Sequence, residues 1–349
     1  MKITETIKSK IPKLGGFNDK SFLIQMIIII PLGLLVLPSS VGRSSYFNHE
    51  ILSVKDLLPS IIFLLVFCFL RKTLACGIFV KLSAKIIKRK PEWTEEFLKF
   101  RTERIGLTLF KAIYFVLITP FAIYLFRNED WVPHALFGQG KGDLSLLWEN
   151  FPYVPRVPML QLYYCIELGY HLHSLVYHLI LPARNDFYES LLHHLTTVFL
   201  IVLSYSNNCA RLSVLVMILH DVVDAFMYIA KTLMDVANMV VFLPFYLFFM
   251  YSYLYFRLWV LPRYIIPGAY DAIHYIPEGV PFGYTTWALL NILLVVLFFL
   301  HIYWFKLIID TTVAMLKKEG IVDPHATQKA VDFNKVEENE KDKEKEKNE

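Results

Sequence analysis

The placement of apolar residues constrains this chain more than any other feature of its sequence. They form blocks of about 17 to 25 residues, the length that an α-helix needs to cross a hydrocarbon layer of about 30 Å. Because 56% of the 349 residues are hydrophobic, the chain carries more apolar surface than one soluble core can bury. The sequence therefore predicts an all-α, polytopic membrane helix bundle with seven transmembrane helices, at about residues 57–80, 106–126, 157–181, 189–205, 210–231, 238–258 and 285–309.

A shorter apolar segment at residues 22–38 leaves the number of spans at seven or eight. It contains Pro31 and follows a lysine-rich start, so it fits a retained spanning helix, an uncleaved signal anchor or a cleaved signal peptide. We assign residues 1–56 to an N-terminal region, and residues 57–90 to the first core helix and the basic loop after it.

Basic residues predict the orientation of the chain. The run from Lys81 to Lys90 follows the first core helix, and the positive-inside rule places this loop in the cytoplasm. Six further crossings return the C-terminus to the same side, and the short loop at Arg184 then also lies in the cytoplasm. Two other roles for the run stay open, namely binding to the phosphates of a coenzyme A ester and contact with anionic lipid.

The C-terminal tail, residues 319–349, has alternating charges and no apolar anchors, which predicts disorder. Lys345 and Lys347 match the K-x-K-x-x pattern of a cytosolic retrieval signal for the endoplasmic reticulum. A tail so rich in lysine also produces this match by chance. We predict a multi-pass protein of the endoplasmic reticulum membrane with a cytosolic C-terminus.

Ionisable side chains concentrate on two consecutive apolar blocks. Such residues are costly inside a bilayer and therefore mark functional sites. Five of them, joined through the polar turn at residues 206–208, are the candidate catalytic residues: His193, His194, His220, Asp221 and Asp224. Two helices joined by a short turn run antiparallel, so His194 and Asp221 lie at equal depth, just below the cytoplasmic surface. A carboxylate beside a histidine stabilises the imidazolium, as a general base or nucleophile requires.

The preceding block carries a polar stripe at helical spacing, formed by Glu167, His171, Ser174 and His178. This stripe either lines the same cavity or holds helices together by interhelical hydrogen bonds. The candidate substrate-binding or cavity-lining residues are Glu167, His171, Ser174, Thr197, Asn208, Arg211 and Tyr164.

Other classes of chemistry have less support in the sequence. No GxGxxG or GxxxxGK(S/T) phosphate loop occurs, which argues against nucleotide hydrolysis. The four cysteines have neither disulfide nor zinc-type spacing. The single HH pair lacks the further histidines of di-iron histidine boxes, and one zinc ion held by histidine and aspartate is the remaining metal alternative. We predict no metal, no cofactor and no nucleic-acid partner.

A longer pattern surrounds these residues: His193-His194-Leu195-Thr196-Thr197, Ser204-Tyr205, Asn207-Asn208, Arg211, His220-Asp221, Asp224 and Ala230-Lys231. This pattern, at residues 193–231, closely resembles the Lag1 motif of ceramide synthases. Residues 95–318 resemble a complete TLC domain with six transmembrane helices. The chain departs from the family at Ser213, Val223 and Tyr228, where Gly, Ser and Glu are usual, and Tyr228 puts any role of that position in doubt.

The resemblance implies that a fatty acyl group passes from acyl-CoA, a co-substrate, to the amine of a sphingoid base. One of His193 and His194 would be the base or a nucleophile that forms an acyl-imidazole, and the other an oxyanion donor. Asp221 and Asp224 would orient them and balance their charge. The implied partners are acyl-CoA, the sphingoid base and membrane lipids, in a homo- or hetero-oligomer. The alternative function is a non-catalytic TLC-domain protein that senses lipid or assists translocation.

Overall fold

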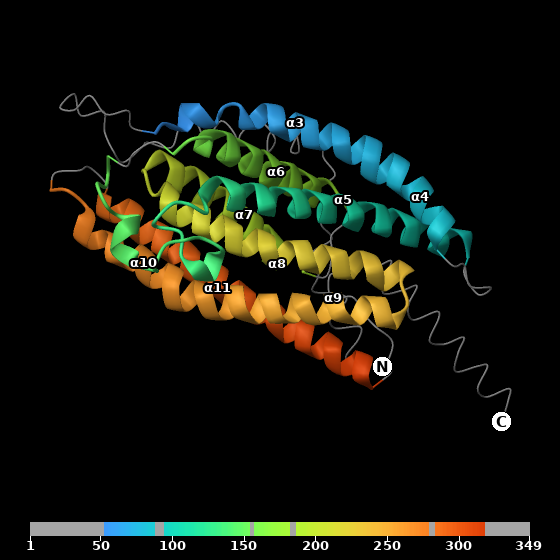
Figure 1. The fold of residues 1–349 in the computed structure, drawn as a ribbon. Helices are drawn as coiled ribbons and strands as arrows, with labels where there is room; N and C mark the ends of the chain where they lie inside the picture. Colours follow the sequence, from blue (N-terminus) through green and yellow to red (C-terminus); the bar gives the residue numbers. More distant parts are fainter. Residues whose placement is uncertain (1–51, 88–93, 154–156, 182–185, 279–282, 318–349) are drawn as a thin grey trace, which may run out of the picture.

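The computed structural model describes residues 52–87, 94–153, 157–181, 186–278 and 283–317. Within these ranges the chain is helical and contains no strand. Its helices lie side by side in one elongated bundle (Figure 1). Four sequence predictions fall outside the described residues: those on the segment at 22–38, on Arg184, on the end of the basic run at 88–90 and on the tail at 319–349.

The helical elements follow the predicted blocks closely. In chain order they are η1 (Val54–Leu57), α3 (Ser60–Leu70), η2 (Arg71–Ile78), α4 (Phe79–Ile86), α5 (Glu95–Phe126), η3 (His134–Leu136), η4 (Leu144–Leu147), α6 (Leu160–Ile180), α7 (Phe187–Ser206), α8 (Ala210–Val236), α9 (Met239–Ser252), η5 (Tyr253–Ile265), α10 (Ile266–Asp271), η6 (Ala272–Tyr275) and α11 (Gly283–Leu316). The segments η2 and η5 are π-helical and continue their neighbours without a break. The predicted all-α bundle is confirmed.

Six helical segments in the described residues are long and apolar enough to cross a membrane: Val54–Ile86, Glu95–Phe126, Phe187–Ser206, Ala210–Met234, Met239–Tyr275 and Gly283–Leu316. The seventh predicted span corresponds to α6, which is helical but is not among these six. This helix carries Glu167, His171 and His178, and such polar residues lower its hydropathy.

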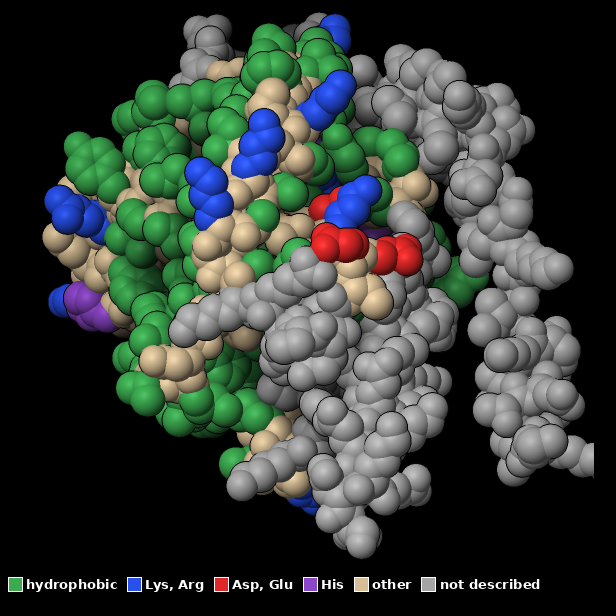
Figure 2. Space-filling view, turned by 90° about the vertical axis from the view of Figure 1, so that its right-hand side faces the viewer, with side chains coloured by type: hydrophobic (Ala, Val, Ile, Leu, Met, Phe, Trp, Pro, Cys, Tyr) green, Lys and Arg blue, Asp and Glu red, His purple; other side chains and the backbone are tan. Residues whose placement is uncertain are grey.

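One end of the bundle is basic. Figure 2 shows the end at which α4 finishes and α5 begins, and lysine and arginine side chains gather on it. Helix α5 starts there with a side-chain cap, because the Thr94 side chain accepts a hydrogen bond from the Phe97 N–H. This end is the one that the positive-inside rule assigns to the cytoplasm.

The turn between α7 and α8 forms at the polar residues that the sequence singled out. Asn208 has a left-handed backbone with φ of 57°, a conformation that asparagine tolerates better than most residues. The Asn207 side chain donates a hydrogen bond of 2.7 Å to the Leu203 carbonyl, which closes the end of α7. The two helices are therefore antiparallel neighbours, as predicted.

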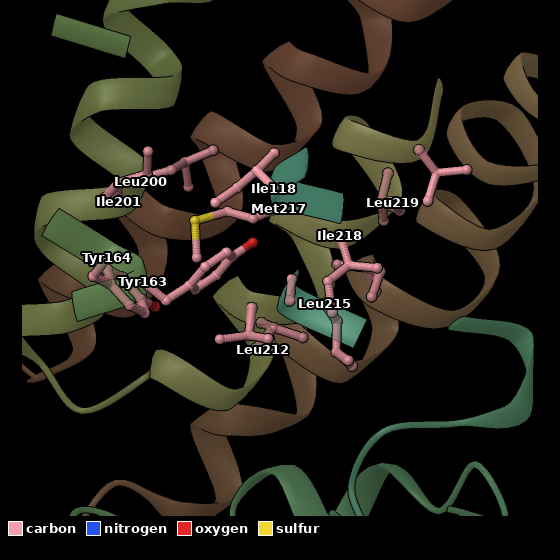
Figure 3. Close-up of a cluster of buried hydrophobic side chains, with 14 of the residues drawn as sticks. Ile118, Tyr163, Tyr164, Leu200, Ile201, Leu212, Leu215, Met217, Ile218 and Leu219 are labelled. Carbon is pink, nitrogen blue, oxygen red and sulfur yellow. The ribbon is translucent and has the colours of Figure 1, made fainter. Parts of the chain in front are cut away.

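Helix α8 lies at the centre of the bundle. It is the most buried of the six candidate spans, and it packs against α5, α7 and α9. Figure 3 shows its apolar side chains, among them Leu215, Ile218 and Leu219, packed with Tyr163 of α6 and Ile118 of α5. Because α8 is held on several sides, its polar residues have fixed positions relative to the surrounding helices.

The N-terminal rod α3–η2–α4 packs on the bundle through two glycines. A Cβ atom added to Gly169 of α6 would lie 2.5 Å from the Phe63 Cβ and 2.9 Å from the Ser60 carbonyl oxygen. A Cβ added to Gly106 of α5 would overlap the Ala75 carbonyl oxygen. Small residues let membrane helices approach closely, so these two positions set the distance of the rod from the bundle.

Replacing Gly169 with alanine is expected to push α3 away from α6 and destabilise the protein by about 1–3 kcal/mol. The apparent melting midpoint in detergent measures this change. Gly77→Ala is the matched control in the same rod, because its added Cβ meets only the Lys72 carbonyl, at 3.7 Å. Equal midpoints for the two variants would show that the glycine contact does not set the packing.

Candidate active site

A cavity of about 190 Å³ lies in the basic half of the bundle. Its walls come from α5, α6, α7, α8, α9, η5 and α11. Five predicted site residues line it: His171, Ser174, His193, His194 and Asp224. Lining residues that the sequence did not single out include Lys111, Arg257 and Trp304. The cavity therefore joins the histidine pair of α7 to part of the polar stripe of α6.

The histidine pair has aromatic neighbours. The ring centroids of His193 and His194 are 5.7 Å apart, the His193 ring meets the edge of Trp304 at 5.2 Å, and His194 lies 5.3 Å from His178. The Nδ1 atoms of both histidines are buried and have no hydrogen-bond partner in the described part of the chain. The carboxylates predicted to orient this pair have other partners.

Asp224 pairs with an arginine. The Arg257 Nη2 lies 2.6 Å from the Asp224 Oδ1, and it also donates to the His220 carbonyl at 3.2 Å. Arg257 belongs to η5, and π-helical turns occur often at functional sites. The apolar pattern at residues 238–258 predicts a spanning helix and does not single out Arg257. An arginine inside such an apolar block indicates a functional site, as the ionisable residues of α8 do.

Asp221 lies behind the cavity wall in a buried acidic cluster. It lies near Glu167, and the Tyr163 hydroxyl lies 3.5 Å from its Oδ2. The Glu167 Oε2 lies in turn 3.5 Å from the His171 Nε2. Glu167 is fully buried and Asp221 is 2% exposed. His171 is thus the residue that connects the two carboxyl groups to the cavity.

His220 binds another histidine. Its Nε2 lies 2.7 Å from the Nε2 of His301 on α11, and its Nδ1 lies 2.6 Å from the Val216 carbonyl. A carbonyl oxygen only accepts, so Nδ1 of His220 donates and its Nε2 accepts from His301. This pair connects α8 to α11 and does not line the cavity.

In the described residues, no group of three or more His, Cys, Asp or Glu side chains fits a metal ion.

Three predicted substrate-binding residues, Asn208, Arg211 and Tyr164, lie beside the α7–α8 turn and do not line this cavity. Asn208 donates to the Pro152 carbonyl at 2.6 Å, and Arg211 donates to the Leu146 carbonyl at 2.6 Å. The Tyr164 hydroxyl donates to the Ala210 carbonyl at 3.2 Å. Asn208 and Arg211 thus fasten the loop before α6, and Tyr164 connects α6 to the start of α8. Thr197, one turn beyond His193, is half-buried and also does not line the cavity.

Tyr228 stands in the cavity wall at a position where the sequence resemblance was imperfect. Its hydroxyl accepts a hydrogen bond of 3.2 Å from the Lys111 ammonium, and its ring stacks on Phe115 at 5.6 Å. A tyrosine here can bind Lys111 without adding a negative charge to the cavity.

Comparisons with known proteins agree with this architecture. Residues 104–310 match the family model described as the TLC domain, and this stretch contains α6, α7, α8 and the cavity histidines. Ceramide synthase 4 of Mus musculus is 36% identical over 180 residues, which are 50% of this chain and 43% of that protein. Ceramide synthase 4 of Bos taurus is 35% identical over 177 residues, 49% of this chain and 42% of that protein.

A plant relative matches over a greater length. The ASC1-like protein of Solanum lycopersicum is 30% identical over 288 residues, which are 79% of this chain and 90% of that protein. The chain spans less than half the length of the two ceramide synthase 4 proteins. With its spanning helices, and with the family model matched across all the helices that form the cavity, this multi-pass membrane protein belongs to the TLC-domain family.

Proposed function

We propose that this chain is a ceramide synthase, which transfers a fatty acyl group from acyl-CoA to the amine of a sphingoid base. One observation carries the proposal: the adjacent pair His193–His194 lines a cavity in the basic half of a bundle whose relatives include proteins named ceramide synthase. In this position the pair is accessible to a soluble thioester from the cytoplasm and to a lipid amine from the bilayer.

The reaction needs the chemistry that histidine provides. The amine is mostly protonated at neutral pH and must lose protons, and the attacked carbonyl passes through a tetrahedral oxyanion. One of His193 and His194 acts as base or as a nucleophile that forms an acyl-imidazole, and the other donates a hydrogen bond to the oxyanion. Thiolate is a tolerable leaving group, so no metal or cofactor is required in this proposal.

Arg257 favours the same reaction by its charge. Its guanidinium is held by Asp224 and lies in the wall of the cavity. A fixed positive charge stabilises the negative charge that develops on the acyl oxygen, more strongly where water is scarce. Asp224 therefore acts through Arg257, and this replaces the direct contact with the histidines that the sequence suggested.

The proposed location follows from the same orientation. Acyl-CoA is soluble and charged, so it reaches the cavity from the cytoplasmic side. We propose that the chain resides in the endoplasmic reticulum membrane with its C-terminus in the cytosol.

Supplying this chain to cells that lack their own ceramide synthases is expected to restore ceramides, because the cavity contains the residues for N-acylation. Lipid profiling by mass spectrometry measures the products and also gives the acyl-chain length. The control is a His193→Ala/His194→Ala double variant at equal membrane abundance. Absence of ceramide with the wild-type chain present in the membrane would favour a non-catalytic lipid-sensing or translocation-associated protein.

A further inference from the structure

His171 differs from the other two cavity-lining histidines in its partner. In the described part of the chain it is the one with a carboxylate partner, since its Nε2 lies 3.5 Å from the Glu167 Oε2. The Nδ1 atoms of His193 and His194 have no hydrogen-bond partner there. A carboxylate beside one ring nitrogen orients an imidazole and stabilises its protonated form. His171 is therefore the cavity histidine whose ring a carboxylate can orient.

The contact with Glu167 also fixes which atom of His171 faces a substrate. Glu167 faces Nε2, so the neutral ring that donates from Nε2 to the carboxylate keeps its lone pair on Nδ1. The side chain is 14% exposed, and it lines the cavity. The separation of 3.5 Å is longer than a good hydrogen bond, but such contacts shorten in many enzymes when the substrate binds.

Further polar side chains lie behind Glu167. Asp221 lies near Glu167, and the Tyr163 hydroxyl lies 3.5 Å from Asp221. Two carboxyl groups that meet away from water are stable when a proton lies between them. Tyr163, Asp221, Glu167 and His171 thus form a continuous row from the buried centre of the bundle to the cavity, with the histidine at its open end.

We propose that His171 is the general base that removes a proton from the attacking amine, with Glu167 as its orienting carboxylate. This inference rests on the proposed N-acyltransferase function. It leaves His193 and His194 for the acyl group, one of them as nucleophile or oxyanion donor. It also gives the polar stripe of α6 a chemical role in place of a purely structural one.

The proton balance fits this division. The ammonium group of the substrate first loses one proton to solvent, and the neutral nitrogen attacks the acyl carbon. His171 Nδ1 takes a second proton from that nitrogen as the C–N bond forms. The bond between the acyl carbon and its leaving group breaks, and the leaving atom takes the electron pair. The thiolate of coenzyme A then takes the proton from His171, so one amide, one thiol and one released proton result.

Several charged and titratable groups surround His171. From the neighbouring elements they are Lys111 of α5, Glu167 of α6, His193 and His194 of α7, His220, Asp221 and Asp224 of α8, and Arg257 of η5. A test must therefore compare variants at one position over a range of pH.

The test measures ceramide formation by the purified protein from acyl-CoA and sphinganine between pH 6.5 and 9. His171→Gln is expected to lower kcat about 10²- to 10⁴-fold near pH 7 with little change in the KM for acyl-CoA. This loss should shrink at least tenfold by pH 9, because hydroxide then replaces the missing base. Glu167→Gln should give a smaller loss with the same trend.

His173→Phe is the matched control on the same helix. His173 does not line the cavity, and its ring lies among Phe67, Phe110 and Tyr177 with both nitrogens unpartnered in the described residues. This variant should keep the wild-type kcat and pH profile. A His171→Gln protein with the wild-type rate, or with a loss that is equal at every pH, would overturn the inference. A wild-type protein that forms no ceramide would instead overturn the proposed function.

Discussion

Purified His193→Ala and His194→Ala proteins are each expected to form ceramide at least about 10³-fold more slowly than the wild type. Each substitution removes from the cavity wall one of the two imidazoles that we propose to act on the acyl group. The rate of ceramide formation from acyl-CoA and sphinganine in detergent measures the effect. A melting midpoint for each variant shows that it is folded.

Leu192→Ala is the matched control for this pair. Leu192 is the residue before His193 on α7, and its side chain is 46% exposed on the outer surface of the bundle. It should retain the wild-type rate. If the reaction passes through an acyl-imidazole, one of the two histidine variants will also lose covalent labelling by acyl-CoA, as seen by mass spectrometry. Folded variants at both histidines with wild-type rates would exclude a catalytic role for the pair.

Replacing Arg257 with methionine is expected to lower both stability and activity. The substitution leaves the Asp224 carboxylate in the cavity wall without the partner that now lies 2.6 Å away. Breaking a buried ion pair in this way costs about 3 kcal/mol, which corresponds to a fall of about 5 °C or more in the apparent melting midpoint. Ceramide formation should fall as well, because the positive charge beside the reacting carbonyl is lost.

A double-mutant cycle separates these two effects. Asp224→Leu alone removes the carboxylate partner of Arg257, whereas the double variant Arg257→Met/Asp224→Leu removes both charges and should recover most of the stability. It should not recover activity, since the guanidinium is still absent. A double variant as unstable as the sum of the two single variants would contradict the pairing, and an active double variant would contradict a catalytic role for the charge.

The sequence predicts the helices well because a bilayer imposes a single length scale on them. The seven apolar blocks all correspond to helices, and the polar turn at residues 206–208 forms as expected. The antiparallel arrangement of α7 and α8 also predicts equal depth for His194 and Asp221. Depth says nothing about rotation around each helix, however. His194 faces the cavity, whereas Asp221 faces Glu167 behind it.

The partners that the sequence could not supply come from helices distant in the chain. Arg257 reaches Asp224 from η5, and His301 reaches His220 from α11. Helical periodicity predicts neither of these contacts, because the packing of segments distant in the sequence determines them. Asn208 and Arg211 lie away from the cavity for a related reason. They are close to the histidines in the sequence, but the α7–α8 turn beside them lies at the other end of α7 from the cavity. Their side chains therefore bind the loop before α6.

The direction in which Arg257 points depends on the number of residues in the π-helical segment η5. A π turn holds about one residue more than an α turn, so side chains on either side of it differ in direction by about 100°. The continuous helix formed by η5 and α10 has contacts on both sides of this segment. Arg257 of η5 pairs with Asp224, and the Gly268 carbonyl of α10 accepts a hydrogen bond of 2.7 Å from the Trp148 indole. Deleting one residue between them would keep the helix but rotate one contact away. A relative with a one-residue gap in this segment is therefore expected to have its arginine turned out of the cavity.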